Sequence, residues 1–160
     1  MKAAGKLKAA RTFHREIGDA MFSQRVKSVM QRKKMLTAPP ETTVSEAARL
    51  MAKKNVGAVM VVEEERLVGI FTERDVVIRV IAKGRDAQTT RLAEVMTAAP
   101  TTVDPDKTYG HALLMMHEHG FRHVPVIENG KPVGIVSARN ALDPEMEEFV
   151  SEARRREHIR

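Results

Sequence analysis

Two stretches of the sequence combine residue types that suit the binding of a phosphorylated sugar. Residues 69–75 read Gly-Ile-Phe-Thr-Glu-Arg-Asp, and residues 134–140 read Gly-Ile-Val-Ser-Ala-Arg-Asn. In each, an apolar run typical of a strand leads into a hydroxyl residue that suits the start of a helix. Unpaired backbone amides and the helix dipole attract an anion there. We predict that Thr72 donates to a phosphate and that Asp75 accepts from the 2′ and 3′ hydroxyls of a ribose, as an acidic residue does in dinucleotide-binding folds.

The same spacing also has a purely structural interpretation. A hydroxyl and a carboxylate three residues apart form a capping box, which is also found in helices that bind no ligand. The duplication favours binding, because a cap requires neither the preceding glycine nor the arginine that both copies share at Arg74 and Arg139. Asn140 is a departure, because its amide is uncharged and accepts through a single oxygen. We therefore favour the first stretch as a ligand site and leave the occupancy of the second open.

Both stretches belong to a longer internal repeat. An offset of 65 residues also relates Pro40 to Pro105, Thr43 to Thr108, Ala47 to Ala112 and Met51 to Met116. Residues 26–30 resemble residues 92–96 at an offset of 66, so the repeated unit begins near residue 26. A repeat of this length predicts that the chain contains two copies of one structural unit.

Each unit is predicted to contain an extended first segment, a helix, two strands and a second helix. In the first unit, Thr43 begins a helix that Asn55 or Gly57 ends. Strands over 58–62 and 67–71 flank a hairpin turn. A helix from Thr72 to Gly84 then follows, with one apolar face formed by Val76, Val77, Val80 and Ile81.

The second unit has the same plan with clearer turn signals. A helix runs from Thr108 to Gly120, and strands over 123–127 and 132–136 flank Asn129-Gly130, the strongest short hairpin signal. Outside the two units, the periodicity of apolar residues predicts a helix over 7–24, and Asp143-Pro144 begins a C-terminal helix.

Taken together, these features resemble a tandem of cystathionine-β-synthase (CBS) domains. The resemblance rests on residues 69–75 and on the strand Arg122–Val126, and it covers about residues 26–142. It implies a mixed α/β (α+β) fold of two β-α-β-β-α repeats about a pseudo-twofold axis, with ligand clefts between them. The chain would comprise a basic arm (1–25), a first repeat (26–84), a second repeat (85–142) and a C-terminal helix (143–160). The resemblance also implies a homodimer and a ligand sensor, not an enzyme.

Two sets of residues are predicted to bind adenosine-containing ligands. A helix dipole contributes only about 0.3–1 kcal/mol, whereas a dissociation constant of ~10 μM requires roughly −7 kcal/mol. Burial of the base against Ala58–Val61 and charge-assisted bonds from Arg74, Arg122 or Arg139 must supply the rest. Gly69 would allow close backbone approach. The first site comprises Thr37, Gly57, Ala58, Val59, Met60, Thr72, Arg74 and Asp75. The second comprises Thr102, Arg122, His123, Val124, Pro125, Ser137, Arg139 and Asn140. Because Pro125 stands where the first unit has Met60, the two pockets are unequal and can prefer different ligands.

The composition argues against several other functions. There is no cysteine, no apolar run as long as the 18 residues of a membrane span and no N-terminal signal-like segment, so we expect a cytoplasmic protein. His111, His117, His119 and His123 lack the spacing of a metal site, and we predict no metal. No Gly-x-Ser-x-Gly elbow predicts a nucleophile, and we predict no catalytic residue.

The positive charge of the chain lies in its first part. Residues 1–35 hold ten lysines or arginines against two acids, and the rest of the chain is close to neutral. Nucleic-acid binding by this arm is one alternative function, although no aromatic residues alternate with the basic ones. A structural interaction module with vacant clefts is another. The favoured hypothesis is a regulatory module that senses AMP, ADP, ATP or NAD(H) and signals to an unknown protein effector.

Overall fold

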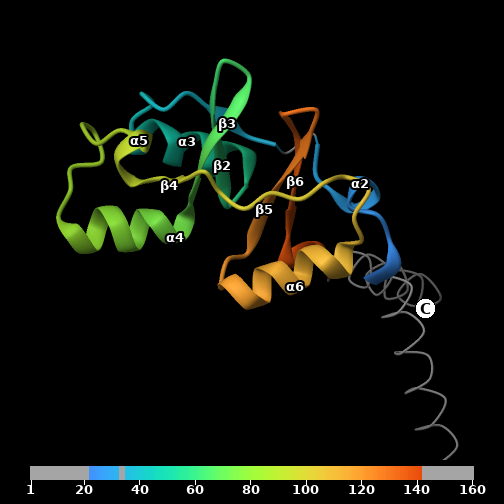
Figure 1. The fold of residues 1–160 in the computed structure, drawn as a ribbon. Coiled ribbons are helices and arrows are strands. Elements are labelled where there is room, and N and C mark those ends of the chain that lie inside the picture. Colours follow the sequence, from blue (N-terminus) through green and yellow to red (C-terminus); the bar gives the residue numbers. More distant parts are fainter. Residues whose placement is uncertain (1–21, 33–34, 142–160) are drawn as a thin grey trace, which may run out of the picture.

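The computed structural model describes residues 22–32 and 35–141 of the chain (Figure 1). Most of the predicted helix over 7–24 and of the basic arm lies outside these residues. The predicted C-terminal helix lies wholly outside them. Within the described residues, no helix is both long enough and apolar enough to span a bilayer.

The first half of the chain forms the elements that its caps and turns predict. They are β1 (Thr37–Ala38), α3 (Val44–Lys54), β2 (Ala58–Glu63) and β3 (Arg66–Thr72). The Thr43 hydroxyl caps α3 by accepting from the Glu46 amide at 3.2 Å, and Asn55 ends it in the left-handed conformation, at φ 52°. The hairpin turn places Glu64 and Glu65 at φ 47° and 63°, as a two-residue hairpin loop requires.

A helical segment follows β3 and ends at Gly84, which has φ 63°. It consists of α4 (Glu73–Asp75), the π-helical turn η1 (Val76–Val80) and the 3₁₀ turn η2 (Ile81–Lys83). The prediction of a single apolar face was wrong. Val80 is fully buried and Val76 packs on the same core, whereas Val77 and Ile81 are 60% and 65% exposed. Adjacent residues point in different directions around a helix, and only one of these two directions faces the core.

The second half repeats the arrangement with α6 (Tyr109–His119), β5 (His123–Glu128), β6 (Lys131–Ser137) and the 3₁₀ turn η3 (Ala138–Ala141). Thr108 caps α6 through the His111 amide at 3.2 Å, and Gly120 ends the helix at φ 73°. Asn129 and Gly130 form the hairpin turn at φ 52° and 79°. These caps and turns confirm the sequence prediction, because they depend only on local geometry.

The short segments that precede the two halves are exchanged between them. Val26 of α2 (Val26–Val29) lies in the hydrophobic core of the second half with Tyr109 and Val136. Leu92 of α5 (Leu92–Val95) lies in the core of the first half, and β4 (Thr97–Ala98) pairs with β3. Figure 1 shows α2 beside the second hairpin and α5 beside the first. Each compact half therefore contains a segment from the other side of the sequence repeat.

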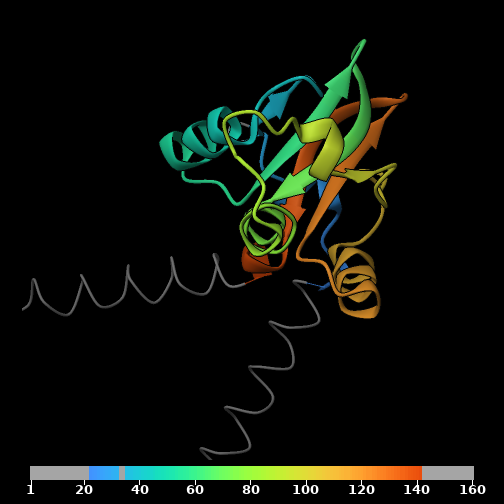
Figure 2. The same ribbon diagram turned by 90° about the vertical axis from the view of Figure 1, so that its left-hand side faces the viewer.

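The two halves meet through β3 of the first sheet and β6 of the second. The first sheet has the order β1-β2-β3-β4, and β5 pairs with β6 in the second. Ala58, Ile70 and Ile135 form a small buried cluster between the halves, in which Ile70 and Ile135 occupy equivalent positions of the repeat. Figure 2 shows the two hairpins extending in the same direction, and Lys131 pairs with Glu65 near their turns at 2.6 Å. This arrangement creates two grooves at the boundary. One lies beside the end of β3, at Thr72, and the other beside the end of β6, at Ser137.

Candidate functional site

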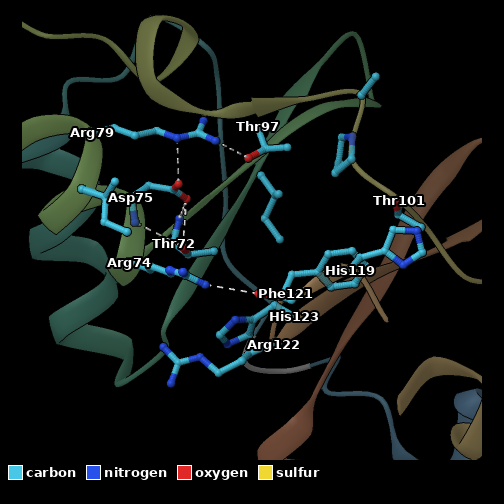
Figure 3. A pocket seen from close by; sticks show the side chains of 15 residues that line it. Thr72, Arg74, Asp75, Arg79, Thr97, Thr101, His119, Phe121, Arg122 and His123 are labelled. Carbon is cyan, nitrogen blue, oxygen red and sulfur yellow. Dashed lines mark hydrogen bonds and ion pairs between the residues drawn. The ribbon is translucent and has the colours of Figure 1, made fainter. Parts of the chain in front are cut away.

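The first cleft is a cavity of about 480 Å³ between the two halves (Figure 3). A small-molecule site typically has this size. The first half supplies Ile70, Thr72, Arg74, Asp75, Ile78 and Arg79; the connecting segment supplies Thr97, Ala99, Pro100 and Thr101; the second half supplies His119, Gly120, Phe121, Arg122 and His123. The lining therefore combines apolar side chains with arginines and a carboxylate.

Asp75 is held in the first cleft by contacts on both of its oxygens. Oδ2 accepts from the Thr72 amide and from the Thr72 hydroxyl, each at 2.8 Å, and Oδ1 lies 3.2 Å from Nε of Arg79. The side chain is 13% exposed. Because two carboxylate oxygens provide about four acceptor positions, these three contacts leave Asp75 able to accept from one further donor.

The prediction of unpaired backbone amides at this helix start was wrong for two of them. The Glu73 amide donates to the Gly57 carbonyl at 3.0 Å, and the Asp75 amide donates to the Thr72 hydroxyl at 3.4 Å. Thr72 and Asp75 form the capping box that was the structural alternative. The amides of Glu73 and Asp75 are satisfied because the neighbouring strand and the cap supply acceptors. An anion in this cleft would therefore depend mainly on side chains, because two amides of this helix start already have acceptors.

Arg74 and Arg122 are the cations best placed to contact such an anion. Nη1 of Arg74 donates to the Gly120 carbonyl at 3.2 Å, and Nη2 of Arg122 lies 3.4 Å from Oε1 of Glu73. The side chains of Arg122 and Glu73 are 64% and 59% exposed. Exposed pairs of this kind are weak, so a phosphate could readily compete with Glu73 for Arg122.

The second cleft, of about 460 Å³, lies on the other side of the boundary. Its lining consists of Gln31, Asn55, Val56, Gly57, Ala58, Glu73, Arg122, His123, Ile135, Ser137, Ala138 and Arg139. Tyr109, which is fully buried, supports this wall by donating its hydroxyl to the Ser137 carbonyl at 2.8 Å. The backbone of Asn140 continues the turn η3, and its side chain lies outside what the structure describes.

Arg122 and His123 line both clefts and thus form the wall between them. Burial lowers the pKa of His123 below its ordinary value, and the positive charges of Arg122 and Arg139 lower it further, whereas the negative charge of Glu73 opposes the shift. The neutral imidazole is therefore favoured at this position, which keeps an additional charge out of the wall.

The structure divides the predicted site residues differently from the sequence prediction. Thr72, Arg74 and Asp75 share a cleft with Arg122 and His123 of the other half, whereas Gly57 and Ala58 share theirs with Ser137 and Arg139. Buried strand positions that line neither cleft are Val59, Met60, Val124 and Pro125, and Thr37 and Thr102 are exposed and also line neither. The predicted adenine slot at 58–61 is thus reduced to Ala58. The predicted sites each drew mainly on one repeat, whereas each cleft of the structure is lined by residues of both halves.

Gly69 also has a different role from the one predicted. A Cβ at this position would lie 2.2 Å from Sδ of Met96, so the glycine makes room for this methionine and not for a ligand. Gly134 makes room for Met30 in the same way, with 2.8 Å to its sulfur. Sequence reasoning also missed Arg79, Phe121 and the segment 97–101. The spacing of the motif carries no signal for them, because they come together only in the tertiary structure.

Within the described part of the chain, no group of three or more His, Asp or Glu side chains is arranged to hold a metal ion. His119 stacks on Phe121 with ring centroids 5.6 Å apart, and its Nδ1 lies 3.0 Å from the Met115 carbonyl. These two rings form part of the wall of the first cleft.

Comparison with known proteins identifies the family. Residues 26–82 and 92–144 match the model of the CBS domain. The chain therefore belongs to the CBS domain family and carries two CBS repeats in a mixed α+β fold, as the sequence predicted. The CBS domain-containing protein YhcV of Bacillus subtilis is 40% identical over 101 residues, which are 63% of this chain and 71% of that protein. Several other curated relatives are longer, and the match covers between 14% and 22% of them.

Solved structures share the same architecture. An uncharacterized conserved protein from Pyrococcus horikoshii aligns with a TM-score of 0.72 and 32% identity over 78% of this chain and 93% of that one. The CBS domain protein PAE2072 from Pyrobaculum aerophilum, which was solved in complex with AMP, aligns with a TM-score of 0.67 and 28% identity over 73% of this chain and 89% of that one.

Proposed function

We propose that this protein is a non-enzymatic regulatory module of the cytoplasm whose clefts bind adenosine-containing ligands (AMP, ADP, ATP or NAD(H)). The observation that carries the proposal is the composition of the first cleft. It places an incompletely satisfied carboxylate, Asp75, in one cavity with two exposed arginines, Arg74 and Arg122, and the aromatic ring of Phe121. The AMP complex of a protein with the same fold supports this interpretation.

Each part of an adenine nucleotide has a matching surface in this cleft. The base would lie against the apolar wall of Ile70, Ile78 and Phe121, where burial supplies most of the affinity. The ribose would donate a hydrogen bond to the remaining acceptor position of Asp75. Arg74 and Arg122 would make charge-assisted bonds to the phosphate, because neither is locked into a buried network.

Ligand binding in one cleft would change the charge of the other. Arg122 faces both clefts, whereas its partner Glu73 faces only the second of the two. A phosphate that draws Arg122 into the first cleft would leave Glu73 uncompensated in the second and disfavour an anion there. The ligand would thus favour one position of Arg122 in the wall between the clefts, and a protein effector could distinguish the bound from the unbound repeats by this change.

A thermal-shift screen of AMP, ADP, ATP and NAD(H) tests the proposal. At 100 times its dissociation constant, a ligand should add about 2.7 kcal/mol, which corresponds to a rise in Tm of roughly 5–10 °C. Asp75→Ala should lose most of the shift, Asn140→Ala should report on the second cleft, and Lys83→Gln, an exposed change on the same helical segment, should behave as wild type. The proposal fails if no adenosine ligand raises the Tm of the wild-type protein.

We further propose that the module forms a homodimer through the exposed apolar residues of the helical segment 73–83. Val77 and Ile81 are 60% and 65% exposed, and Leu114 of α6 is 53% exposed. Figure 1 shows this segment and α6 on the same side of the sheets. Adjacent exposed apolar side chains mark an interaction surface. Light scattering after size exclusion should give a dimer for wild type and Lys83→Gln and a monomer for Val77→Glu/Ile81→Glu. A monomeric wild-type protein would refute this interface.

A further inference from the structure

Arg79 connects two walls of the first cleft through three hydrogen bonds and an ion pair. Besides its ion pair with Oδ1 of Asp75 at 3.2 Å, Nη1 donates to the carbonyls of Val95 and Met96 at 3.0 and 2.7 Å. Nη2 donates to the Thr97 hydroxyl at 3.2 Å. Figure 3 shows the guanidinium between Asp75 and Thr97. Since a guanidinium has five N–H donors, three of them are used in hydrogen bonds within the protein, and Nε faces Asp75 in the ion pair.

These contacts distinguish Arg79 from the other two arginines of the cleft. Arg74 and Arg122 are exposed and each make one side-chain hydrogen bond, whereas Arg79 donates to two backbone carbonyls and the Thr97 hydroxyl. Releasing Arg79 toward a phosphate would leave both carbonyls and the carboxylate without this donor, which is costly. Arg79 is therefore poorly suited to bind an anion and well suited to hold a neighbouring side chain.

The side chain that Arg79 holds is the predicted ribose acceptor. Thr72 holds Oδ2 of Asp75 through two hydrogen bonds, and the ion pair with Nε of Arg79 restrains Oδ1. With both oxygens held, the plane of the carboxylate cannot rotate freely, and the remaining acceptor position has a defined direction in the cavity. A hydrogen bond to a ligand hydroxyl depends steeply on such geometry.

The sequence repeat provides an internal comparison. The offset of 65 residues maps Asp75 onto Asn140 and Arg79 onto Pro144. The carboxylate and the guanidinium thus occur together in the first copy and are both replaced in the second. This correspondence is expected if the arginine serves the carboxylate.

We propose that Arg79 is the positioning residue that makes the first cleft selective for ribose over 2′-deoxyribose. The inference rests on the proposed binding of adenine nucleotides and assigns to that site the origin of its sugar selectivity. Arg79 would act through Asp75 without contacting the ligand. A residue that only stabilised the fold would change the affinities for ribonucleotide and deoxyribonucleotide by the same factor.

Calorimetric titration with AMP, ADP and ATP and with their 2′-deoxy counterparts tests this inference. The signal of the first cleft is identified as the one that Asp75→Ala removes. Wild type should bind the ribonucleotide about tenfold more tightly, the value of one charge-assisted hydrogen bond. Arg79→Gln should bring this ratio close to one. Arg79→Lys should retain part of the ratio, because an ammonium can still pair with Asp75 but cannot form the fork to Val95 and Met96. Lys83→Gln should keep the wild-type ratio.

Each other outcome has a definite meaning. An unchanged ratio in both Arg79 variants overturns the inference and leaves the proposed function in place, as does a wild-type protein that binds both sugars equally. If none of these nucleotides binds the wild-type protein, both the function and the inference fail. Should Arg79→Gln not fold, as judged by circular dichroism, the Arg79→Lys ratio decides the question: a full wild-type ratio overturns the inference and a reduced one supports it.

Discussion

Replacing Gly69 with alanine tests how the exchanged segments close over the sheets. The new Cβ would lie 2.2 Å from Sδ and 2.9 Å from Cγ of Met96, so the sulfur must retreat by about 1 Å to reach an ordinary contact of 3.4 Å. Such overpacking costs about 1–3 kcal/mol. Gly69 is not among the positive-φ glycines, so its backbone conformation suits alanine. Alanine should therefore also stabilise the folded protein by about 0.4–1 kcal/mol, because it lowers the conformational entropy of the unfolded chain. We expect a net loss of about 0.5–2 kcal/mol.

Urea unfolding followed by circular dichroism measures this loss as a lower midpoint at an unchanged m-value. A double-mutant cycle with Met96→Ala should show a coupling of at least ~0.5 kcal/mol, because the second change removes the clash. The matched cycle with Met30→Ala should be additive, since Met30 packs on Gly134 instead. Coupling of Gly69 to Met30, or a neutral Gly69→Ala, would refute the exchange of segments on which both clefts depend.

Three other predictions concern single side-chain contacts and one partly buried histidine. Tyr109→Phe should destabilise the protein by about 1 kcal/mol in urea, because it removes the hydrogen bond that the buried Tyr109 hydroxyl donates to the Ser137 carbonyl; an unchanged midpoint would contradict this role. Because the pKa of His123 is lowered in the folded protein, the unfolded chain binds the proton more tightly, and the free energy of unfolding should decline as the pH falls below about 6.5. In urea titrations, His123→Gln should flatten this decline. An equally steep decline in the variant would count against this role of His123. NMR titration should find the pKa of Asp106 below its ordinary value, because Lys27 donates to it at 2.7 Å, and Lys27→Met should raise it; no change would mean that α2 does not dock there.

The local elements could be predicted because each depends on a few consecutive residues. Thr43, Asn55, Thr108 and Gly120 satisfy or end helices through contacts within one turn, and Asn129-Gly130 forms its hairpin through its own backbone preferences. The repeat was visible because equivalent positions keep equivalent residues. The same reasoning gave too simple an apolar face for the helical segment 73–83, because the direction of the core is not a local property.

The composition of the clefts was beyond local reasoning. The motif indicated Thr72, Arg74 and Asp75, but the strands of its own repeat were assigned to the same site, whereas the fold supplies Gly120–His123 from the other half. Arg79 belongs to no recognised motif, and its role depends on the carbonyls of Val95 and Met96, which lie 16 and 17 residues further along the chain.

The sequence by itself determined the repeated structural unit and the fact that it occurs twice. The caps, turns and hairpin strands of this unit depend on interactions between residues that are close in the chain. What only the tertiary structure decided is the pairing of one unit with segments of the other. Packing of Met96 on Gly69, exchange of α2 and α5, and burial of Ile70 against Ile135 join residues far apart in the chain. Because the clefts form at that boundary, their chemistry is a property of the assembled pair.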